Sequence, residues 1–322
     1  QSKALETTGL FILNENFFPD SISRISYYDV KTGVTHKNYF FQKNGKELGY
    51  GANDLAIYGS KLYCVVGGVT EGHIEVINPE TGISIKRVSV KNEDGTNSQP
   101  RSITFHENKA YITTYSQKVI RLDTASLNID GTANLSGTYT EGICLYNDNL
   151  YVCNSGWGSG NTISVVSLSS FTETGTITVP SNPMSIKATA SGEIYFTTAG
   201  WSMASPSNLH LLNPEQKQVT TLDVRASKLA LTKDFIYAVD FFYGDYADHI
   251  SKINLQTKEV TDVSDMFGDY YMVYDISVNP LNGDIYLTDQ GQNVVVFDKD
   301  GNETLNLKTG VNITSKVVPV IR

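Results

Sequence analysis

The chain has 322 residues, and 34 acidic against 25 basic side chains give it a net charge of −9 at pH 7. No basic run interrupts this composition, which argues against nucleic acid or an anionic membrane as a partner. The longest apolar stretches have the length of strands, so we expect no transmembrane segment.

We assign residues 1–8 to a leader or linker remnant and residues 9–322 to one domain, because a repeat fills the chain. Each copy is an apolar strand, then Asn, Asp or Ser, then a tight polar turn. The turn-opening residues of the seven copies are Asp29, Asn78, Asp123, Ser167, Asn213, Asn254 and Asp298. Copies spaced by about 45 residues, each with several short strands, predict an all-β fold: a seven-bladed β-propeller with four-stranded blades.

The second unit illustrates the four strands. We expect them at Asp54–Tyr58, Leu62–Val66, Ile74–Asn78 and Ser84–Val90. The first unit has no equivalent of the first strand, whereas an extra strand, Ile313–Ile321, follows the last unit. We predict that this C-terminal strand completes the first blade, which closes the ring and removes its open edge.

The cysteines are Cys64, Cys144 and Cys153. Their odd number and the absence of a CxxC motif give neither a disulfide framework nor a zinc site. Cys144 and Cys153 flank a hairpin turn, where a disulfide between adjacent strands would be strained. We favour buried free thiols, which pack as small hydrophobic groups.

The connections between the second and third strands of each unit, the B–C loops, vary in length. Four of them carry insertions: Asn14–Ser21, Asn154–Asn161, Ala199–Asn208 and Asp240–His249. In a propeller the B–C loops share one face with the connections between units. Length variation confined to one face predicts that this face binds a ligand.

Aromatic side chains gather in these loops, where Gly- and Ser-rich sequence offers no obvious core for them. Clusters of this kind are typical of a ligand or partner surface. The alternative is that the rings cap the ends of neighbouring blades and that Arg101 pairs with a nearby carboxylate. The predicted ligand-binding residues are Phe17, Phe18, Arg101, Tyr115, Trp157, Trp201, Phe242, Tyr243 and Tyr246.

The sequence contains no catalytic motif that we identify. The five histidines fall in separate units, and there is no metal-binding HExxH, nucleophile elbow, phosphate loop or dinucleotide fingerprint. We therefore predict no catalytic residues, no metal and no cofactor. Some propeller hydrolases bind a metal through Glu, Asn and Asp at the channel mouth, but capping of turns is the simpler role for such residues. The residues that could form such a site are Glu15, Asn53, Asp54, Glu141, Asn154, Asp240 and Asp289.

The segments NPMSI, GEIYFTT and LHLLNPEQK (residues 182–217), with relatives QPRSITF (99–105) and VYDISVNPLNGDIYLTD (273–289), resemble the YVTN-repeat (YncE-like) propellers. The opening GLFILNE (9–15), Phe17 and the YYD turn (27–29) resemble a group of bacterial surface propeller lipoproteins, sometimes labelled surface-layer proteins. Asn16 stands where that group has Gly. One branch of the group captures vitamin B12 outside the cell and passes it to an outer-membrane transporter.

The resemblance implies an extracytoplasmic protein at the bacterial cell surface, held by a lipid anchor whose signal lies outside this chain. Our first hypothesis is non-enzymatic capture of a corrinoid at the face with the long B–C loops. The alternative is a glycan- or protein-binding surface module. The third hypothesis is that the protein is a metal-dependent, lactonase-like hydrolase.

Overall fold

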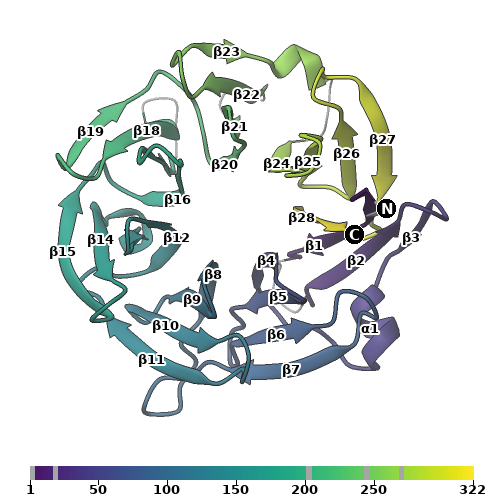
Figure 1. Cartoon of the computed structure of the whole chain (residues 1–322), viewed down its shortest axis with the longest axis horizontal. Helices are drawn as coiled ribbons and strands as arrows, with labels where there is room; N and C mark the ends of the chain where they lie inside the picture. Colours follow the sequence, from purple (N-terminus) through teal and green to yellow (C-terminus); the bar gives the residue numbers. More distant parts are fainter. Residues whose placement is uncertain (1–3, 17–20, 201–204, 243–246, 268–271) are drawn as a thin grey trace.

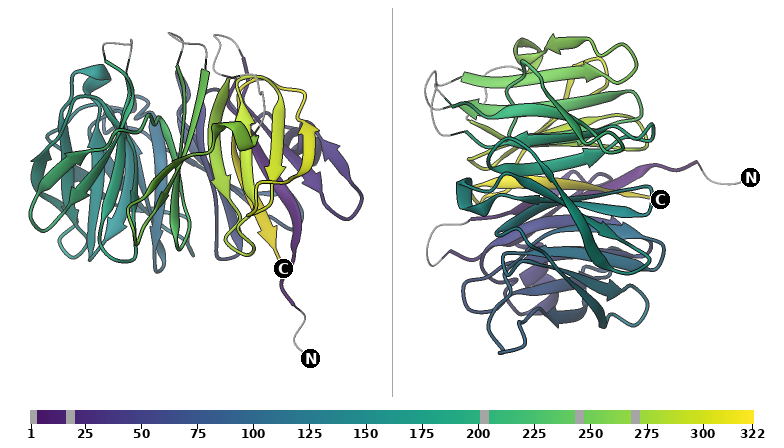
Figure 2. Two further views of the ribbon diagram at one scale, coloured as in Figure 1. Left: turned by 90° about the horizontal axis from the view of Figure 1, so that it is seen from above. Right: turned by 90° about the vertical axis from the view of Figure 1, so that its left-hand side faces the viewer.

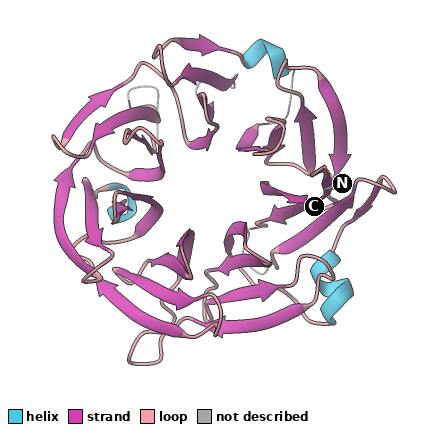
Figure 3. Ribbon diagram, viewed as in Figure 1, coloured by secondary structure: helices cyan, strands magenta, loops and turns pink. Residues whose placement is uncertain are grey.

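Seven four-stranded antiparallel sheets surround a central channel in the computed structural model, which describes residues 4–16, 21–200, 205–242, 247–267 and 272–322 (Figure 1). The predicted seven-bladed β-propeller is therefore confirmed. Each blade runs from an innermost strand A at the channel to an outermost strand D at the rim (Figure 3).

The first four blades, in the order A to D, have the following bounds. Blade 1 consists of β28 (Thr314–Ile321), β1 (Thr7–Asn14), β2 (Arg24–Asp29) and β3 (Val34–His36). Blade 2 consists of β4 (Ala52–Tyr58), β5 (Lys61–Val66), β6 (His73–Ile77) and β7 (Ser84–Ser89). Blade 3 consists of β8 (Pro100–His106), β9 (Lys109–Thr114), β10 (Lys118–Asp123) and β11 (Ile129–Asn134). Blade 4 consists of β12 (Thr140–Tyr146), β13 (Asn149–Asn154), β14 (Thr162–Ser167) and β15 (Thr172–Thr178).

The other three blades follow the same scheme. Blade 5 consists of β16 (Pro183–Ala188), β17 (Ile194–Thr198), β18 (Asn208–Asn213) and β19 (Gln218–Thr221). Blade 6 consists of β20 (Lys228–Leu231), β21 (Phe235–Phe242), β22 (Ala247–Asn254) and β23 (Val260–Asp262). Blade 7 consists of β24 (Val273–Val278), β25 (Ile285–Asp289), β26 (Asn293–Phe297) and β27 (Glu303–Lys308).

The core lies between neighbouring blades. In β5, Leu62 packs in the cluster shared with blade 1, and the next residue, Tyr63, packs in the cluster shared with blade 3. Successive side chains of a strand point to opposite faces, and both faces of each blade are covered by a neighbour. This explains why the second strand of every unit is apolar at consecutive positions.

The repeated Asp or Asn at the end of strand C shapes the turn to strand D. Its side-chain oxygen accepts backbone N–H groups two or three residues further on, for example from Glu80 to Asn78 at 2.8 Å and from Ser126 to Asp123 at 2.8 Å. This side-chain mimicry of a turn accounts for the Asp or Asn that recurs in six of the seven units; the fourth unit has Ser167 at this place.

The C-terminal strand closes the ring as predicted. β28 pairs antiparallel with β1, with Phe11 opposite Val318 and Leu10 opposite Pro319. Blade 1 thus combines one strand from the end of the chain with three from its beginning.

In the described part of the chain, three short helices lie between strands: α1 (Tyr39–Asn44), η1 (Gly156–Gly158) and η2 (Ser264–Phe267). The repeat pattern did not reveal α1, which buries Tyr39 and Phe40 against blades 1 and 2. No helix among the described residues has the length and apolar character needed to cross a membrane.

The three cysteines are buried free thiols, as predicted. Cys144 and Cys153 do not lie opposite each other, because Cys144 pairs with Tyr151 and Cys153 with Ile163. Burial raises the pKa of the Cys144 thiol to about 12, so this group stays protonated at neutral pH.

Candidate ligand-binding site at the channel mouth

The B–C loops and the connections between blades share one face of the ring, which we call the upper face. Both chain ends lie on the opposite, lower face (Figure 2). The upper face surrounds the mouth of the channel, where the first residues of the innermost strands meet.

A repeated backbone device directs side chains at this mouth. Five non-glycine residues just before strand A have a positive φ; they are Gln99 (55°), Tyr139 (48°), Asn182 (66°), Met272 (52°) and Ile313 (56°). Gly51 has the same conformation before β4. The pairing register then shifts at the start of the strand, as between Pro100 and Ile103 and between Thr140 and Ile143. Such bulges re-aim side chains; here they bring Arg101 and Glu141 together.

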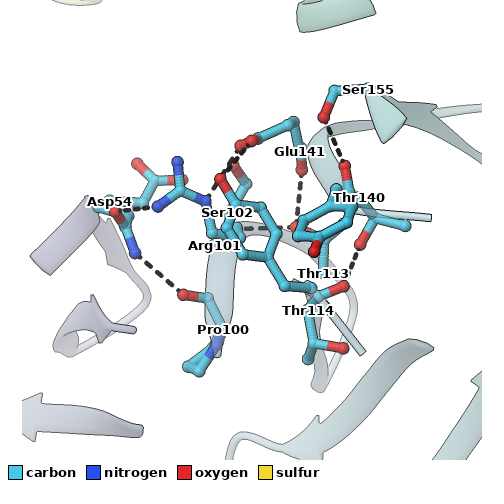
Figure 4. Close-up of polar contacts among 12 residues, drawn as sticks. Asp54, Pro100, Arg101, Ser102, Thr113, Thr114, Thr140, Glu141 and Ser155 are labelled. Atoms are coloured by element: carbon cyan, nitrogen blue, oxygen red, sulfur yellow. Dashed lines mark hydrogen bonds and ion pairs between the residues drawn. The ribbon is translucent and has the colours of Figure 1, made fainter. Parts of the chain in front are cut away.

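Arg101 is the centre of a polar network (Figure 4). Its Nε donates to Glu141 Oε2 at 3.0 Å, and its Nη1 donates to the side-chain oxygen of Asn53. Its guanidinium lies 4.6 Å from the centre of the Tyr115 ring, and the Tyr115 hydroxyl donates to Glu141 Oε1 at 2.6 Å. Burial opposes the charge of Arg101, but Glu141 and Tyr115 outweigh it and raise the pKa of the guanidinium. Arg101 is therefore a fixed cation.

Three aromatic rings cover this network on the solvent side. The rings of Tyr115 and Trp157 are 6.0 Å apart in an edge-on arrangement, and Tyr139 lies 5.2 Å from Tyr115 and 5.4 Å from Trp157. Trp157 is 71% exposed and Tyr139 is 40% exposed. The Ser155 side chain holds the two loops together, because its hydroxyl donates to Tyr139 O at 2.8 Å. We call Tyr115, Tyr139 and Trp157 the aromatic cluster.

A second network of the same kind lies on the side of blades 6, 7 and 1. The Lys228 ammonium is 5.3 Å from the centre of the Tyr274 ring, and the Tyr274 hydroxyl donates to Glu15 Oε2 at 2.7 Å. Burial raises the pKa of the Glu15 carboxyl, which Lys228 partly offsets. The mouth thus carries two triads of cation, tyrosine and glutamate: Arg101, Tyr115 and Glu141, and Lys228, Tyr274 and Glu15.

Two further lysines come from the innermost strands. Lys316 of β28 lies 3.9 Å from Asp275 of β24, which raises the pKa of this lysine. Burial and the neighbouring Lys316 lower the pKa of Lys187 in β16, against the attraction of Asp54 and Asp275. The channel wall therefore carries both positive and negative groups.

The structure brings three of the predicted site residues together: Arg101, Tyr115 and Trp157. The pairing of Arg101 with Glu141, weighed as the alternative, is present beside the ring contact. Phe17, Phe18, Trp201, Tyr243 and Tyr246 lie outside the described residues, as does the side chain of Phe242. Tyr274 and Lys228 were not among the predicted site residues. Tyr274 occupies the same place at the start of strand A as Arg101 and Glu141, so aligning the repeats could have found it.

Three of the residues considered for a metal each bind a different partner. Asp289 accepts from the Asn293 backbone at 3.0 Å, and Asp54 accepts from Ile103 N–H at 3.1 Å. The Asn154 side chain donates to Ser164 at 2.8 Å. Within the described ranges, no three His, Cys, Asp or Glu side chains converge as a metal site would require.

Comparison with known proteins relates the chain to a family and to several solved propellers. A family model described as "Domain of unknown function (DUF5074)" matches residues 8–291. A quinonprotein alcohol dehydrogenase-like protein from Bacteroides thetaiotaomicron is 14% identical, with a TM-score of 0.69 over 98% of this chain and 79% of that chain. Hydrazine synthase of Kuenenia stuttgartiensis is 14% identical, with a TM-score of 0.65 over 80% of this chain and 86% of that chain. The WD40 repeats of RRP9 are 8% identical, with a TM-score of 0.66 over 82% of each chain. No curated protein matches the sequence. At these identities the likeness shows the fold alone.

Proposed function

The chain belongs to the DUF5074 family, and from its propeller fold and channel mouth we propose that it is a non-enzymatic ligand-binding protein that captures a corrinoid at the upper face. β-Propellers commonly bind ligands. The chemistry of the mouth decides which ligands this one could accept.

The exposed aromatic cluster carries the proposal. Trp157 leaves 71% of its surface in water although its ring touches two tyrosines. Burying a Trp on a ligand removes a large apolar area from water. Hydrogen bonds also hold the backbone of the loop that carries Trp157: the Trp157 backbone N–H donates to the Ser155 hydroxyl at 3.4 Å, and the Gly156 N–H donates to Thr138 O at 3.0 Å. A loop that is already held in place loses less entropy when a ligand binds.

A corrinoid suits this combination of groups. Its macrocycle offers a wide flat face for Trp157 and Tyr139, and its rim of amides offers donors and acceptors. Arg101 supplies N–H donors, and the side-chain oxygens of Asn53 and Glu141 are acceptors. These three residues also bind one another, because Arg101 donates to both oxygens. Sugar rings also stack on aromatic side chains, so a glycan is the competing ligand.

The proposed setting is the bacterial cell surface, with a lipid anchor outside this chain and an outer-membrane transporter as the receiving partner. This part rests on the resemblance of the opening segment, residues 9–29, to surface propeller lipoproteins. The pH-independent charge of Arg101 would keep such a site competent across the varied pH outside a cell.

Titration with cyanocobalamin tests the proposal, followed by calorimetry and tryptophan fluorescence. We expect saturable binding that Trp157→Ala weakens at least about tenfold, which corresponds to about 1.4 kcal/mol. Because Trp157 is exposed, the melting temperature of the Trp157→Ala variant should stay close to that of the native protein. Phe41→Ala, an exposed ring on α1, serves as the control and should bind normally. Mass spectrometry of the released corrinoid should show it unchanged.

Absence of saturable binding would remove the corrinoid. A panel of glycans would then be tested. A glycan that binds the native protein but not Trp157→Ala would identify the aromatic cluster as a sugar-binding site. Corrinoid binding that survives Trp157→Ala would place the site elsewhere on the molecule.

A further inference from the structure

Two adjoining hollows open on the lower face, between blades 6 and 7. Their volumes are about 270 Å³ and about 550 Å³. Both are lined by Phe235, Tyr237 and Lys252 of blade 6 and by Lys299 of blade 7. We call them the lower groove. It is separate from the aromatic cluster, which is on the upper face.

The lower groove lies where blade 7 lacks a side chain that blades 3 and 4 place against the preceding blade. In blades 3 and 4 the turn from strand C to strand D contains a residue with positive φ, Leu127 in blade 3 and Phe171 in blade 4. The side chain of this residue packs against the preceding blade. Phe171 packs 5.7 Å from the Tyr111 ring in this way. In blade 7 the left-handed residue of the turn is Gly301, which has no side chain and lines the hollow. Space therefore remains beside Tyr237, the counterpart of Tyr111.

Lys252 is a cation at the wall of this space. Its ammonium lies 3.9 Å from the centre of the Phe235 ring and 5.7 Å from that of Tyr237. Both contacts favour a positive charge. Lys252 also lines both hollows, so a ligand in the groove would lie beside it.

In blade 3 the same position also carries a cation, but that cation is paired with a carboxylate. Arg121, the counterpart of Lys252, lies 4.8 Å from the Phe171 ring and donates to Asp130 Oδ1 at 2.7 Å. Lys252 instead faces Thr261 across the strand pair. Among the described residues, no carboxylate lies within ion-pair distance of Lys252.

Two other lysines add positive charge. Lys299 lines both hollows and Lys233 lines the larger one. Asp234 and Glu259 also contribute to the walls, so three cations stand against two anions. This excess is notable in a chain whose net charge is −9, and it favours a negatively charged ligand.

We propose that the lower groove binds a small organic anion, with a flat apolar body against Phe235 and Tyr237 and a carboxylate or phosphate on Lys252 and Lys299. The rings supply the apolar wall, and the lysines supply charge-assisted hydrogen bonds. The site is independent of the corrinoid proposal.

The fluorescent anion 8-anilinonaphthalene-1-sulfonate is a suitable probe, because it combines aromatic rings with a sulfonate. We expect saturable binding to the native chain that weakens as salt rises. Lys252→Gln and Lys299→Gln should each weaken it about tenfold. Thr261→Glu should do the same by giving Lys252 the carboxylate partner that Arg121 has. Since Thr261 lies exposed on the outermost strand β23, this variant tests the site even if Lys252→Gln fails to fold.

Two controls locate the probe. Lys31→Gln changes the net charge equally at an exposed turn of blade 1, and Trp157→Ala alters the upper face; both should bind the probe normally. Displacement by benzoate or by phenyl phosphate then identifies the preferred anion. The proposal would be overturned if all three groove variants bound the probe as tightly as the native chain. It would also be overturned if only Trp157→Ala lost the probe, or if neither benzoate nor phenyl phosphate displaced it.

Discussion

At the scale of single residues, Asp240 is a carboxylate that the fold holds in an unfavourable environment. It is only 3% exposed, and among the described residues its Oδ2 has no hydrogen-bond partner. Burial raises its pKa from 3.8 to about 6, although Ser227, His249 and Arg225 act in the opposite direction. In the native state this carboxyl therefore keeps its proton to a higher pH than in the unfolded chain.

The consequence is a pH-dependent loss of stability. Below about pH 3 the group is protonated in both states and contributes no difference. Between about pH 4 and pH 6 the native state binds more protons than the unfolded state, so the free energy of unfolding falls as the pH rises. Two pKa units correspond to about 3 kcal/mol. Asp240→Asn should recover up to that amount at pH 7.5 and only a few tenths of a kcal/mol at pH 3.5.

Urea unfolding at the two pH values measures this effect. Asp148→Asn, an exposed turn position, is the matched control and should change neither value. An Asp240→Asn variant with the same pH dependence as the native protein would show that Asp240 is not the destabilising group.

At the scale of elements, the repeated feature is the left-handed residue and bulge that begin the innermost strands. A left-handed backbone costs a non-glycine residue roughly 1 kcal/mol. At Gln99, which precedes β8, φ is 55°. The Gln99 carbonyl accepts the Tyr115 N–H at 3.0 Å, so this conformation positions both Arg101 and Tyr115. The strain is located where the site is assembled.

Gln99→Gly should therefore stabilise the protein by about 0.5–1 kcal/mol without changing ligand binding, because Gly adopts this conformation freely. Gln218→Gly is the matched control: it makes the same change in the exposed strand β19, where φ is not positive, and should destabilise by a similar amount. Urea midpoints of both variants provide the measurement. Equal destabilisation by the two substitutions would contradict a strained Gln99.

At the scale of the whole molecule, stability depends on one non-covalent closure. β28 buries Val317 and Val320 and shields the edge of β1. It also lies against the innermost strands of blades 2 and 7. No covalent link in the described chain replaces this pairing, because all three cysteines are free.

Deletion of residues 313–322 should destabilise the entire ring and not only its end. It would expose the edge of β1 and remove several buried side chains, each worth about 1.5–3 kcal/mol. We expect digestion at many sites by a protease that leaves the native protein intact. Deletion of residues 1–5, which ends at the exposed Leu5, is the control and should remain resistant. Digestion confined to blade 1 would contradict closure of the whole ring by β28.

Much of the fold could be predicted from the sequence, because the Asp, Asn or Ser that opens each C–D turn repeats together with the apolar strand before it. The helix α1 could not, since it occurs once and no repeat marks it. At the site, Trp157 was identified from its place in an inserted B–C loop, Tyr115 from the short third B–C loop, and Arg101 from its place at the start of a strand A. Their contacts depend on bulges and on left-handed residues such as Tyr139, and ordinary L residues in that conformation leave no composition signal.

The two chain ends meet at the lower face, and this fixes how the molecule would sit on any support. Glu6 and Arg322 exchange backbone hydrogen bonds of 2.8 and 2.9 Å, and β28 runs from the mouth of the channel to the other side of the ring (Figure 2). A tether, fusion partner or sensor chip joined to either end would therefore hold the ring by its lower face. The aromatic cluster would face outward into solution, whereas the lower groove would lie on the tethered side.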